Sequence, residues 1–485
     1  MPSKDGLRLQ VISGLFWTIG ERIIVKFVGF VISVILARLL LPEDYGVVAL
    51  VLVFIAIIDI IAESGFGGAL IQKKDADAID FSSVFFFSIV FSIILYMFLF
   101  FSSEYIAVFF NLPILVPIIK VMGIKVLFSG INTVQNAFAA KNMLFKNFFF
   151  STLAGTLVSA IIAVPMAYQG YGAWALVAQN LSNTIINTIF LWFTLRWRPC
   201  FAFSLTRMIS LFSFGAKLLV ASVIHTTYSE LRNVLIGKLY TITDLGFYSR
   251  GRSFPMILLD GINIPISRVL FPAISKKQDD SAVVKSMTKR SIKVSAYIVL
   301  PLMAGLAAIA EPLVQLLLTD KWLPCVPYLQ IACFTFAFIP MQTANMQSIN
   351  SLGRSDIYLI LEIIKKSIGL VILLSVMKLG VLAIAASGLV TSILFSIINA
   401  FPNKKIINYG YWEQVKDIAP YLILSLCMCI IVYCINFIQI YLMVKILVQI
   451  IVGVVFYIGT SLLFNMDSLR YILNTIKSFK NNTQA

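Results

Sequence analysis

Residues 46–71 read GVVALVLVFIAIIDIIAESGFGGALI, an apolar run long enough to cross the hydrocarbon core of a bilayer as one helix. Only Asp59 and Glu63 bring charge into this run. The segment before it, 37–46, reads ARLLLPEDYG and carries the Pro, Asp and Gly residues that favour a turn. Similar apolar runs recur along the chain, so the sequence predicts an all-α membrane protein that crosses the bilayer many times.

The composition argues against several other classes of protein. Of the 485 residues, 60% are hydrophobic and 12% are charged, and the mean hydropathy is +0.94. A soluble fold cannot bury that much apolar surface. The net charge of +16 is scattered over short loops and spans, which argues against nucleic acid as a partner. One histidine and six cysteines without a CxxC pair predict no metal site.

A sliding window of about 19 residues predicts fourteen transmembrane segments. The seventh, eighth and tenth are the most polar of them. Their approximate bounds are 12–38, 46–71, 81–103, 114–139, 148–168, 174–195, 209–237, 245–274, 291–310, 324–350, 357–377, 381–402, 419–437 and 441–464.

The loops between these segments differ sharply in charge. On one side lie 22 lysines and arginines, and on the other only five, namely Arg38, Lys238, Lys321, Lys378 and Lys445. The positive-inside rule therefore predicts that both termini are cytoplasmic. The loops on both sides are short and leave no room for an extracellular catalytic domain, so we expect that the protein is not an enzyme.

Three pieces of the first half recur in the second half in the same order. ARLLLPEDYG at 37–46 matches GKLYTITDLG at 237–246, GAWALVA at 172–178 matches GVLAIAA at 380–386, and QNAFAAK at 135–141 matches QSINSLG at 347–353. Recurrence after six crossings predicts two six-helix lobes related by a pseudo-two-fold axis along the membrane normal, which is a transporter arrangement. We expect a first lobe at 1–203 (helices 1–6), a second at 204–402 (helices 7–12), and two further helices with a cytoplasmic tail at 403–485.

Eleven of the 38 lysines and arginines fall inside the predicted spans, where charge is costly. Six acidic residues share these spans, which leaves an excess of five bases. Intramembrane charges usually face a bundle interior or a wet cavity, and a cavity with net positive charge suits a polyanionic cargo. The eleven bases are Arg22, Lys26, Lys120, Lys125, Lys217, Arg232, Arg250, Arg252, Arg268, Lys365 and Lys366.

Polar side chains recur at helical spacing along one face of several spans. In the seventh span this stripe includes His225 and Arg232. In the fourth span it consists of Lys125, Ser129, Asn132 and Asn136. Such stripes also bond packed helices to one another, and buried acids could neutralise buried bases. The residues alone leave these alternatives open. The acids are Glu21, Asp59 and Glu63, and the neighbouring bases are Arg22 and Lys26.

Several motifs occur in a fixed order: GLFW at 14–17, ARLLLPEDYG at 37–46, GFGGALIQK at 65–73, GAWALVAQ at 172–179 and LGRSD at 352–356. Together they resemble the polysaccharide transporter branch of the multidrug/oligosaccharidyl-lipid/polysaccharide exporter superfamily. Within that branch the chain is similar to the Wzx-type flippases, especially the WzxC-like group. The similarity covers about residues 10–400.

This resemblance implies a fourteen-helix, two-lobed flippase of the bacterial inner membrane. Such a protein moves an undecaprenyl-diphosphate-linked oligosaccharide repeat unit from the cytoplasmic to the outer leaflet by alternating access, for the biosynthesis of surface polysaccharide (O-antigen, exopolysaccharide or capsule). Implied partners are membrane lipids, the polysaccharide polymerase and the chain-length machinery. No cofactor is expected, and transport is expected to draw on a gradient of H⁺ or Na⁺.

The resemblance also assigns roles to the buried charged residues. The residues expected to contact the diphosphate and the glycan are Arg22, Lys26, Lys125, Asn132, His225, Arg232, Arg250, Arg252 and Arg268. The acids expected to couple transport to an ion gradient are Glu21, Asp59 and Glu63.

Three other functions fit parts of the same pattern. A multidrug or cation antiporter of the same fold needs an acidic cavity, which the excess of buried bases opposes. A lipid II flippase also carries a diphosphate lipid, and charge does not separate the two cargos. A polysaccharide polymerase or ligase needs an outward-facing catalytic loop, and the predicted outer loops are short.

Overall fold

The structure is a computed structural model that describes residues 24–63, 65–73 and 75–482. Within these ranges it leaves out the side chains of 213–214, 217–218, 264–265, 267–269, 272 and 475–482. All regular secondary structure in the described residues is helical, as the apolar runs predict. The chain divides into two compact units, the first ending at Gly246 and the second beginning at Phe247.

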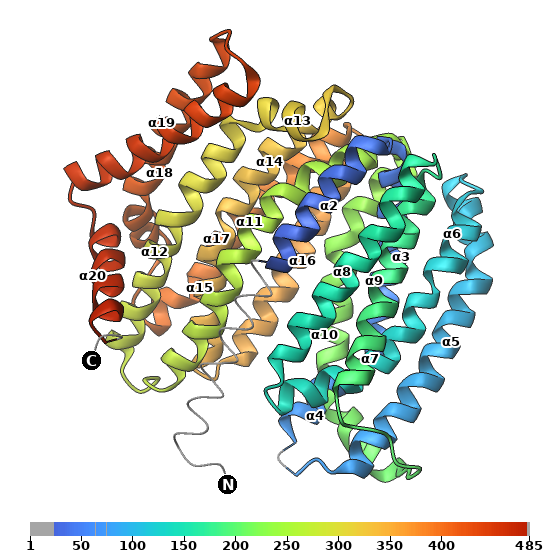
Figure 1. The fold of residues 1–485 in the computed structure, drawn as a ribbon. Coiled ribbons are helices and arrows are strands. Elements are labelled where there is room, and N and C mark those ends of the chain that lie inside the picture. Colours follow the sequence, from blue (N-terminus) through green and yellow to red (C-terminus); the bar gives the residue numbers. More distant parts are fainter. Residues whose placement is uncertain (1–23, 64, 74, 483–485) are drawn as a thin grey trace. The chain divides into compact units, whose positions relative to one another are not determined.

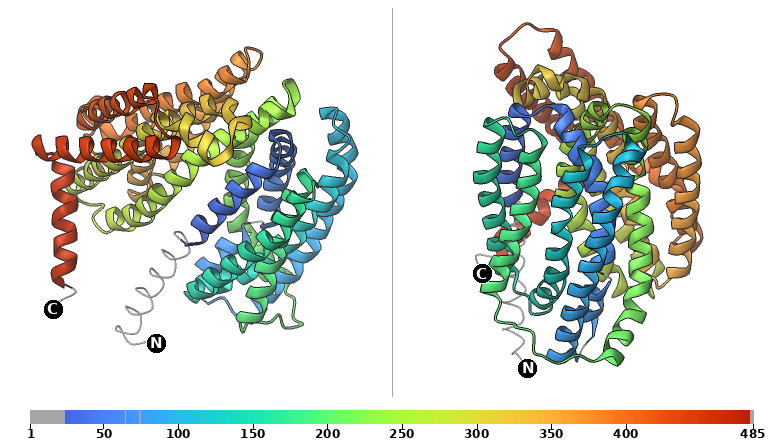
Figure 2. Two further views of the ribbon diagram at one scale, coloured as in Figure 1. Left: turned by 45° about the horizontal axis from the view of Figure 1, so that its top comes forward. Right: turned by 90° about the vertical axis from the view of Figure 1, so that its right-hand side faces the viewer.

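The first unit is a bundle of helices that run nearly parallel or antiparallel to one another (Figures 1 and 2). Its helices α8 and α9 pack together along their lengths, α5 packs on α7, and α10 packs on α3. An aromatic core that includes Phe66, Phe85 and Trp197 fills one end of the bundle. The helices are α2 (Lys26–Leu39), α3 (Pro42–Glu63), α4 (Phe66–Gln72), α5 (Ala78–Phe110), α6 (Leu115–Met122), α7 (Ile124–Lys141), α8 (Phe145–Tyr168), α9 (Ala173–Thr194) and α10 (Leu205–Leu239).

The second unit is also helical, and α11 leads into it from the first. Its helices α12 and α18 make the most extensive contact, and α14 and α15 pack on α17. The core between them includes Tyr297, Tyr421 and Tyr457. The elements are α11 (Ile242–Ser275), α12 (Ser281–Ala308), α13 (Ala310–Leu318), η2 (Asp320–Cys325), α14 (Val326–Ala337), α15 (Ile339–Ser351), α16 (Ser355–Val376), α17 (Val381–Ile406), α18 (Tyr411–Cys434), η3 (Ile435–Phe437), α19 (Leu442–Leu463) and α20 (Asp467–Asn482).

The predicted spans fall on these helices wherever the structure describes them, but some are divided: 46–71 covers α3 and α4, and 114–139 covers α6 and α7. In the described part of the chain, nine helical segments are long and apolar enough to cross a membrane. Five predicted spans are not among them: the first, which is described only from residue 24, the sixth (α9), the seventh (α10), the eighth (α11) and the eleventh (α16). The tenth, Asp320–Ser351, is among them. The protein is therefore an all-helical, multi-span membrane protein, and the total of fourteen spans stays a prediction.

The first repeated motif forms the same local structure at both of its copies. The carboxylate of Asp44 accepts a hydrogen bond from the Leu41 amide at 2.9 Å, and that of Asp244 accepts one from the Thr241 amide at 3.2 Å. Each aspartate lies in the first turn of its helix, α3 or α11, and binds the free backbone amide of the residue just before that helix.

The glycine that follows each aspartate allows the two helix starts to touch. A methyl group on Gly46 would lie 1.9 Å from the carbonyl oxygen of Ile242, and one on Gly246 would lie 2.0 Å from that of Pro42. The contact is reciprocal, so any larger residue at either position would collide with backbone. These two positions lie 200 residues apart in the repeat, and the boundaries of the predicted lobes stay a prediction.

A neutral hydrogen-bond network holds α18 in the second unit. The side-chain amides of Asn345 in α15 and Gln414 in α18 exchange two hydrogen bonds of 2.8 and 2.9 Å. Asn403 in α17 donates to the same Asn345 oxygen at 2.7 Å. All three side chains are completely buried, so the network joins three helices without any charge.

Candidate functional site

One charged contact inside the predicted spans joins α3 to α7 in the first unit. The Asp59 carboxylate lies 3.5 Å from the Lys125 ammonium group and accepts a hydrogen bond of 2.9 Å from the Ser129 hydroxyl. Lys125 and Ser129 belong to the stripe predicted along the fourth span. Glu63 follows Asp59 by one helical turn and is exposed. The sequence suggested Arg22 and Lys26 as partners of these acids, and the structure gives Asp59 a different partner, Lys125.

The rest of the stripe on α7 bonds helices together. The Asn132 amide donates a hydrogen bond of 2.8 Å to the Thr188 hydroxyl on α9, and Asn136 is exposed. A bond between neighbouring helices is what the alternative explanation of polar stripes predicts. Asn132 therefore has a structural partner in this unit, and its contact with cargo stays a prediction.

Helix α10 carries one of the arginines that were predicted to contact cargo. Arg232 is 9% exposed and lies one turn after Tyr228, close to the tyrosine hydroxyl. The neighbouring Glu230 accepts a hydrogen bond of 2.6 Å from the Asn233 amide. His225, nearly two turns before Arg232, is exposed. The seventh span therefore combines a buried guanidinium group with an exposed imidazole.

Two further arginines lie on α11 in the second unit. Arg250 is 6% exposed, and its guanidinium group lies over the Phe254 ring at 5.2 Å. Arg252 donates a hydrogen bond of 2.9 Å to the Tyr248 hydroxyl and lies 5.7 Å from the Phe336 ring. Aromatic rings attract a cation with their faces and can hold it in an apolar setting.

Other predicted site residues lie elsewhere or outside the described part of the chain. Lys26 is exposed on α2. Glu21 and Arg22 lie outside the described residues, and so does the side chain of Arg268. Among the described residues, no group of three histidine, cysteine, aspartate or glutamate side chains could hold a metal ion.

Lys365 on α16 was counted among the intramembrane bases but was not assigned to the site. It is 6% exposed and forms an ion pair with Glu362 on the same helix. Lys366 lies 4.0 Å from the other Glu362 oxygen. This group matches the ion-pair alternative, in which intramembrane acids neutralise intramembrane bases.

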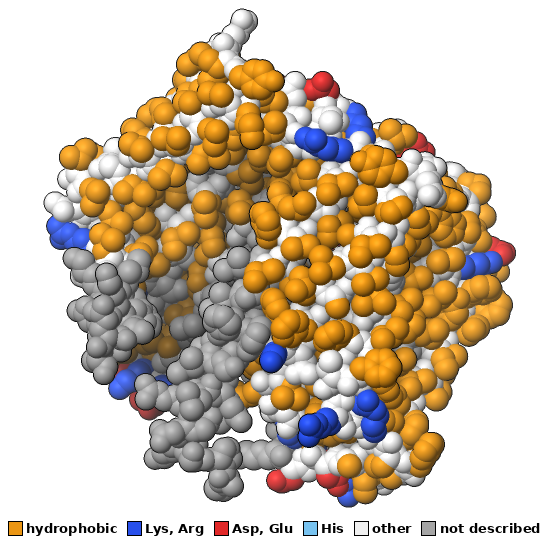
Figure 3. All heavy atoms as spheres, viewed as in Figure 1, with side chains coloured by type: hydrophobic (Ala, Val, Ile, Leu, Met, Phe, Trp, Pro, Cys, Tyr) orange, Lys and Arg blue, Asp and Glu red, His pale blue; other side chains and the backbone are white. Residues whose placement is uncertain are grey.

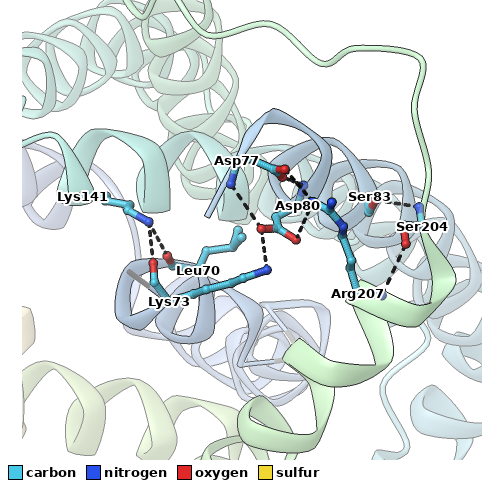
Figure 4. Close-up of polar contacts among 8 residues, drawn as sticks. All are labelled: Leu70, Lys73, Asp77, Asp80, Ser83, Lys141, Ser204 and Arg207. Carbon is cyan, nitrogen blue, oxygen red and sulfur yellow. Dashed lines mark hydrogen bonds and ion pairs between the residues drawn. The ribbon is translucent and has the colours of Figure 1, made fainter. Parts of the chain in front are cut away.

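A charged cluster that the sequence patterns did not predict lies at one end of the first unit and is drawn in Figure 4. Its centre is Asp80, a completely buried residue in the first turn of α5. The Asp80 carboxylate accepts a hydrogen bond of 2.6 Å from the Lys73 ammonium group, which follows α4. Asp77 and Asp80 also form a capping box, in which each side chain binds the other's backbone amide.

The same cluster ties the start of α10 to α5. Arg207 donates a hydrogen bond of 2.6 Å to Asp77, and its guanidinium group lies 3.7 Å from the Asp80 carboxylate. This bond to Arg207 lowers the pKa of Asp77 to about 2. Lys141, at the end of α7, donates to the carbonyl oxygen of Lys73 at 2.6 Å. Four helices, α4, α5, α7 and α10, therefore meet at these charges.

Hydrophobic side chains make up most of the face drawn in Figure 3, and lysines and arginines are scattered among them. A largely apolar surface is typical of a protein that faces lipid. The apolar exterior, the spanning helices and the buried charges together define a polytopic membrane protein whose interior carries polar groups suited to transport.

Solved structures of other proteins share this fold. The structure of the lipid II flippase MurJ in an inward closed conformation superposes with a TM-score of 0.77 at 14% identity, covering 94% of this chain and all of MurJ. An inward-facing multidrug resistance MATE family transporter of the MOP superfamily superposes with a TM-score of 0.63 at 15% identity, covering 79% of this chain and 95% of the transporter. At these identities the likeness shows the fold alone.

The family follows from the sequence. Residues 35–327 match the family model described as polysaccharide biosynthesis protein, which is more than half of the chain. The chain belongs to this family of polysaccharide biosynthesis proteins.

Named relatives are similar over most of their length. The teichuronic acid biosynthesis protein TuaB of Bacillus subtilis (strain 168) is 25% identical over 74% of each chain. The lipopolysaccharide biosynthesis protein WzxC of Escherichia coli (strain K12) is 25% identical over 67% of each chain. The succinoglycan biosynthesis transport protein ExoT of Rhizobium meliloti (strain 1021) is 26% identical over 62% of this chain and 61% of its own.

Proposed function

We propose that this protein is a flippase that moves an undecaprenyl-diphosphate-linked oligosaccharide repeat unit across the bacterial inner membrane. Transport runs from the cytoplasmic to the outer leaflet by alternating access and supplies the biosynthesis of a surface polysaccharide. Its partners are the lipid-linked cargo, the surrounding membrane lipids, and the polymerase and chain-length machinery that use the product.

The burial of two guanidinium groups in α10 and α11, which are the seventh and eighth predicted spans, is the observation that carries this proposal. Arg232 and Arg250 are both more than nine-tenths buried, and a base at the centre of a bilayer costs roughly 2.5–3.5 kcal/mol to insert. Arginine binds phosphate oxygens with two parallel hydrogen bonds. A diphosphate cargo would bind these side chains, and this binding would offset the free-energy cost of burying them.

Family membership and fold support the same cargo class. TuaB, WzxC and ExoT are named for the biosynthesis of three different polysaccharides, and MurJ, which shares the fold, is named for flipping lipid II. A flippase for lipid II itself is the second candidate. A cation antiporter is less well supported because the interior bases outnumber the acids.

The contact between Lys125 and Asp59 is our candidate for coupling to an ion gradient. A carboxylate that binds both an ammonium group and the Ser129 hydroxyl can give up one partner when it is protonated or when it binds Na⁺. Glu63 lies one turn away and is exposed, so it can transfer an ion to Asp59 or accept one from it. Neutralising Asp59 with Asn should therefore slow transport more than neutralising Glu63.

A deletion strain tests the proposal. Loss of the protein should leave lipid-linked repeat units stalled on the cytoplasmic face and should remove the surface glycan. Wild-type protein should restore the glycan, whereas Arg232→Ala and Arg250→Ala should restore little of it at equal expression. Arg196→Ala is the matched control, because Arg196 is exposed and lies outside the spanning helices.

The outcomes separate the function from the site. Full surface glycan in the deletion strain would contradict the function. Full restoration by both arginine variants would leave the flippase and remove these two residues from the cargo site. Accumulation of lipid II in place of the repeat unit would favour the second candidate.

A further inference from the structure

A cavity of about 600 Å³ lies within the second unit, between α12, α18, α19 and the first turn of α20. This volume is in the range of pockets that hold small organic ligands. A second cavity of about 320 Å³ adjoins it and shares Lys293 and Asp467 with it. None of the residues predicted to bind cargo lines either cavity, so this site is separate from the one proposed above.

The larger cavity is polar at one end and apolar at the other. Lys293, Lys416 and Asp467 line its polar end, and Cys427 and Phe456 line its apolar end. Along α18, Cys427 lies eleven residues after Lys416, a distance of roughly 16 Å at 1.5 Å per residue. The cavity therefore follows the helices from a charged end into the apolar part of the spans, which is the shape of an amphiphile.

Positive charges outnumber negative charges around the two cavities. Four bases, Lys289, Arg290, Lys293 and Lys416, and two acids, Asp417 and Asp467, line the two cavities together. Both acids are already occupied, because Asp467 pairs with Lys293 at 2.8 Å and Asp417 pairs with Lys289 at 2.9 Å.

Two of the four bases are not paired with these acids. Within the described part of the chain, Lys416 and Arg290 have no carboxylate partner within 4.0 Å, and the Arg290 guanidinium group lies over the Tyr471 ring at 4.8 Å. The site therefore carries two uncompensated positive charges, and it offers no uncompensated carboxylate to an amine.

The first turn of α20 is held firmly enough to serve as a wall. Ser468 and Tyr421 share a hydrogen bond of 2.8 Å between their buried hydroxyl groups, and the Lys293–Asp467 pair joins the same turn to α12. The bond to Lys293 also lowers the pKa of Asp467. Asp467 consequently stays ionised and keeps Lys293 in place at neutral pH.

We infer that this cavity binds an anionic glycerophospholipid of the surrounding membrane, with its phosphate between Lys416, Arg290 and Lys293 and an acyl chain against Cys427 and Phe456. Basic pockets between spanning helices on the cytoplasmic side recognise acidic lipid headgroups in this way. The loops at this end of α12 and α18 are on the side that the charge pattern predicts to be cytoplasmic. The lipid would join α20 to the spanning helices and would therefore stabilise the second unit.

Native mass spectrometry of the purified full-length chain tests the inference with three lipids. Phosphatidylglycerol and phosphatidylethanolamine with identical acyl chains separate headgroup charge from chain binding, and undecaprenyl phosphate separates a membrane lipid from a cargo-like one. We expect phosphatidylglycerol to bind more tightly than both. Because each base near a lipid surface contributes about five-fold to affinity, Lys416→Gln and Arg290→Gln should each weaken phosphatidylglycerol binding about five-fold.

Two further variants make the result specific to the cavity. Lys405→Gln removes an exposed base from the same unit outside the cavity and should change nothing. Cys427→Trp fills the apolar end and should weaken binding of phosphatidylglycerol while the melting temperature of the lipid-free protein stays at the wild-type value. Arg290→Gln serves in place of Lys416→Gln if the latter lowers that melting temperature.

The inference is overturned by any of three results. Equal binding of phosphatidylglycerol and phosphatidylethanolamine would remove headgroup selection. Unchanged binding by Cys427→Trp together with weaker binding by Lys416→Gln would indicate surface attraction rather than an occupied cavity. Tighter binding of undecaprenyl phosphate with the same response to the variants would assign the cavity to cargo. Each result can be read while the flippase activity is intact, so none of them decides whether the protein is a flippase.

Discussion

The two units join their helices by different polar contacts. In the first unit the buried Asp80 carboxylate is bound by Lys73, and Arg207 binds Asp77 beside it; the Lys73 and Arg207 side chains are 37% and 41% exposed. In the second unit the amides of Asn345, Asn403 and Gln414 bind one another, and all three are completely buried.

The difference indicates which helix each unit can release. Water can solvate an exposed ammonium or guanidinium group when its ion pair breaks, so the contact between α10 and α5 can open at a small cost in free energy. A buried amide that loses its partner pays the whole cost of desolvation. We therefore expect the start of α10 to detach more readily than α18 as the transporter changes conformation.

The largest effect should come from the buried amide network. Gln414→Leu would remove two hydrogen bonds from the Asn345 amide and one from the Tyr409 carbonyl oxygen, in a site that water cannot reach. At about 1–3 kcal/mol for each stranded group, we expect a loss of roughly 2–4 kcal/mol in the free energy of unfolding of the second unit. Denaturant unfolding in detergent measures it, with Gln439→Leu, at an exposed position, as the control. A loss no larger than that of the control would show that α18 does not depend on the network.

A smaller effect should follow from removing the buried charge in the first unit. Asp80→Asn keeps the side-chain shape but loses the ion pair with Lys73 and weakens the attraction to Arg207. Since both cations can turn to water, we expect a loss of about 1–3 kcal/mol. Hydrogen exchange at the start of α10 should also rise. Asp75→Asn, at an exposed position, should stay within about 0.5 kcal/mol of the wild type, and an equal loss in both variants would refute the role of Asp80.

Salt should separate the two kinds of contact. The screening length falls from about 10 Å at 0.1 M to about 3 Å at 1 M ionic strength. The difference in unfolding free energy between wild type and Asp80→Asn should therefore shrink over this range, while the difference for Gln414→Leu should not change. A parallel response of both differences would mean that the charges in the first unit act only through their hydrogen bonds.

The smallest effect concerns pH. Asp77 has a pKa of about 2 in the folded protein because Arg207 binds it, which is below the ordinary value of about 3.9. A lowered pKa in the folded state stabilises the fold above the ordinary value and loses that contribution as the pH falls toward 2. The protection of the α10 start against hydrogen exchange, measured in wild type relative to Arg207→Gln, should thus be constant from pH 8 to 5 and should disappear between about pH 4 and 2. Loss of this difference already between pH 7 and 5 would contradict the assignment.

Much of the fold could be predicted from the sequence because apolar runs and turn residues act locally. The run at 46–71 predicted one spanning helix, where the structure has two, α3 and α4. The repeated Asp and Gly at 44–46 and 244–246 predicted a turn at each copy, where the structure has two similar helix starts. Helical spacing also predicted that Lys125 and Ser129 share a face. It did not predict Asp59 as their common partner, because that contact depends on how α3 packs against α7.

The polar networks could not be predicted for the same reason. Asp80 follows a polar loop and precedes an apolar run, so its sequence gives no sign that it is buried. The spacing of Asp77 and Asp80 fits a capping box, which was the one available signal. Gln414 and Asn345 lie 69 residues apart and face each other only after α15, α17 and α18 have packed.

Translocation by purified protein in vesicles tests the central claim most directly. A fluorescent undecaprenyl-diphosphate oligosaccharide is placed in one leaflet, and the fraction reaching the other leaflet is measured with a reagent that quenches only exposed label. The account predicts movement with the wild-type protein, and little more than protein-free vesicles show with Arg250→Ala. Movement at the protein-free rate with the wild type, or at the wild-type rate with Arg250→Ala and Arg232→Ala combined, would contradict it.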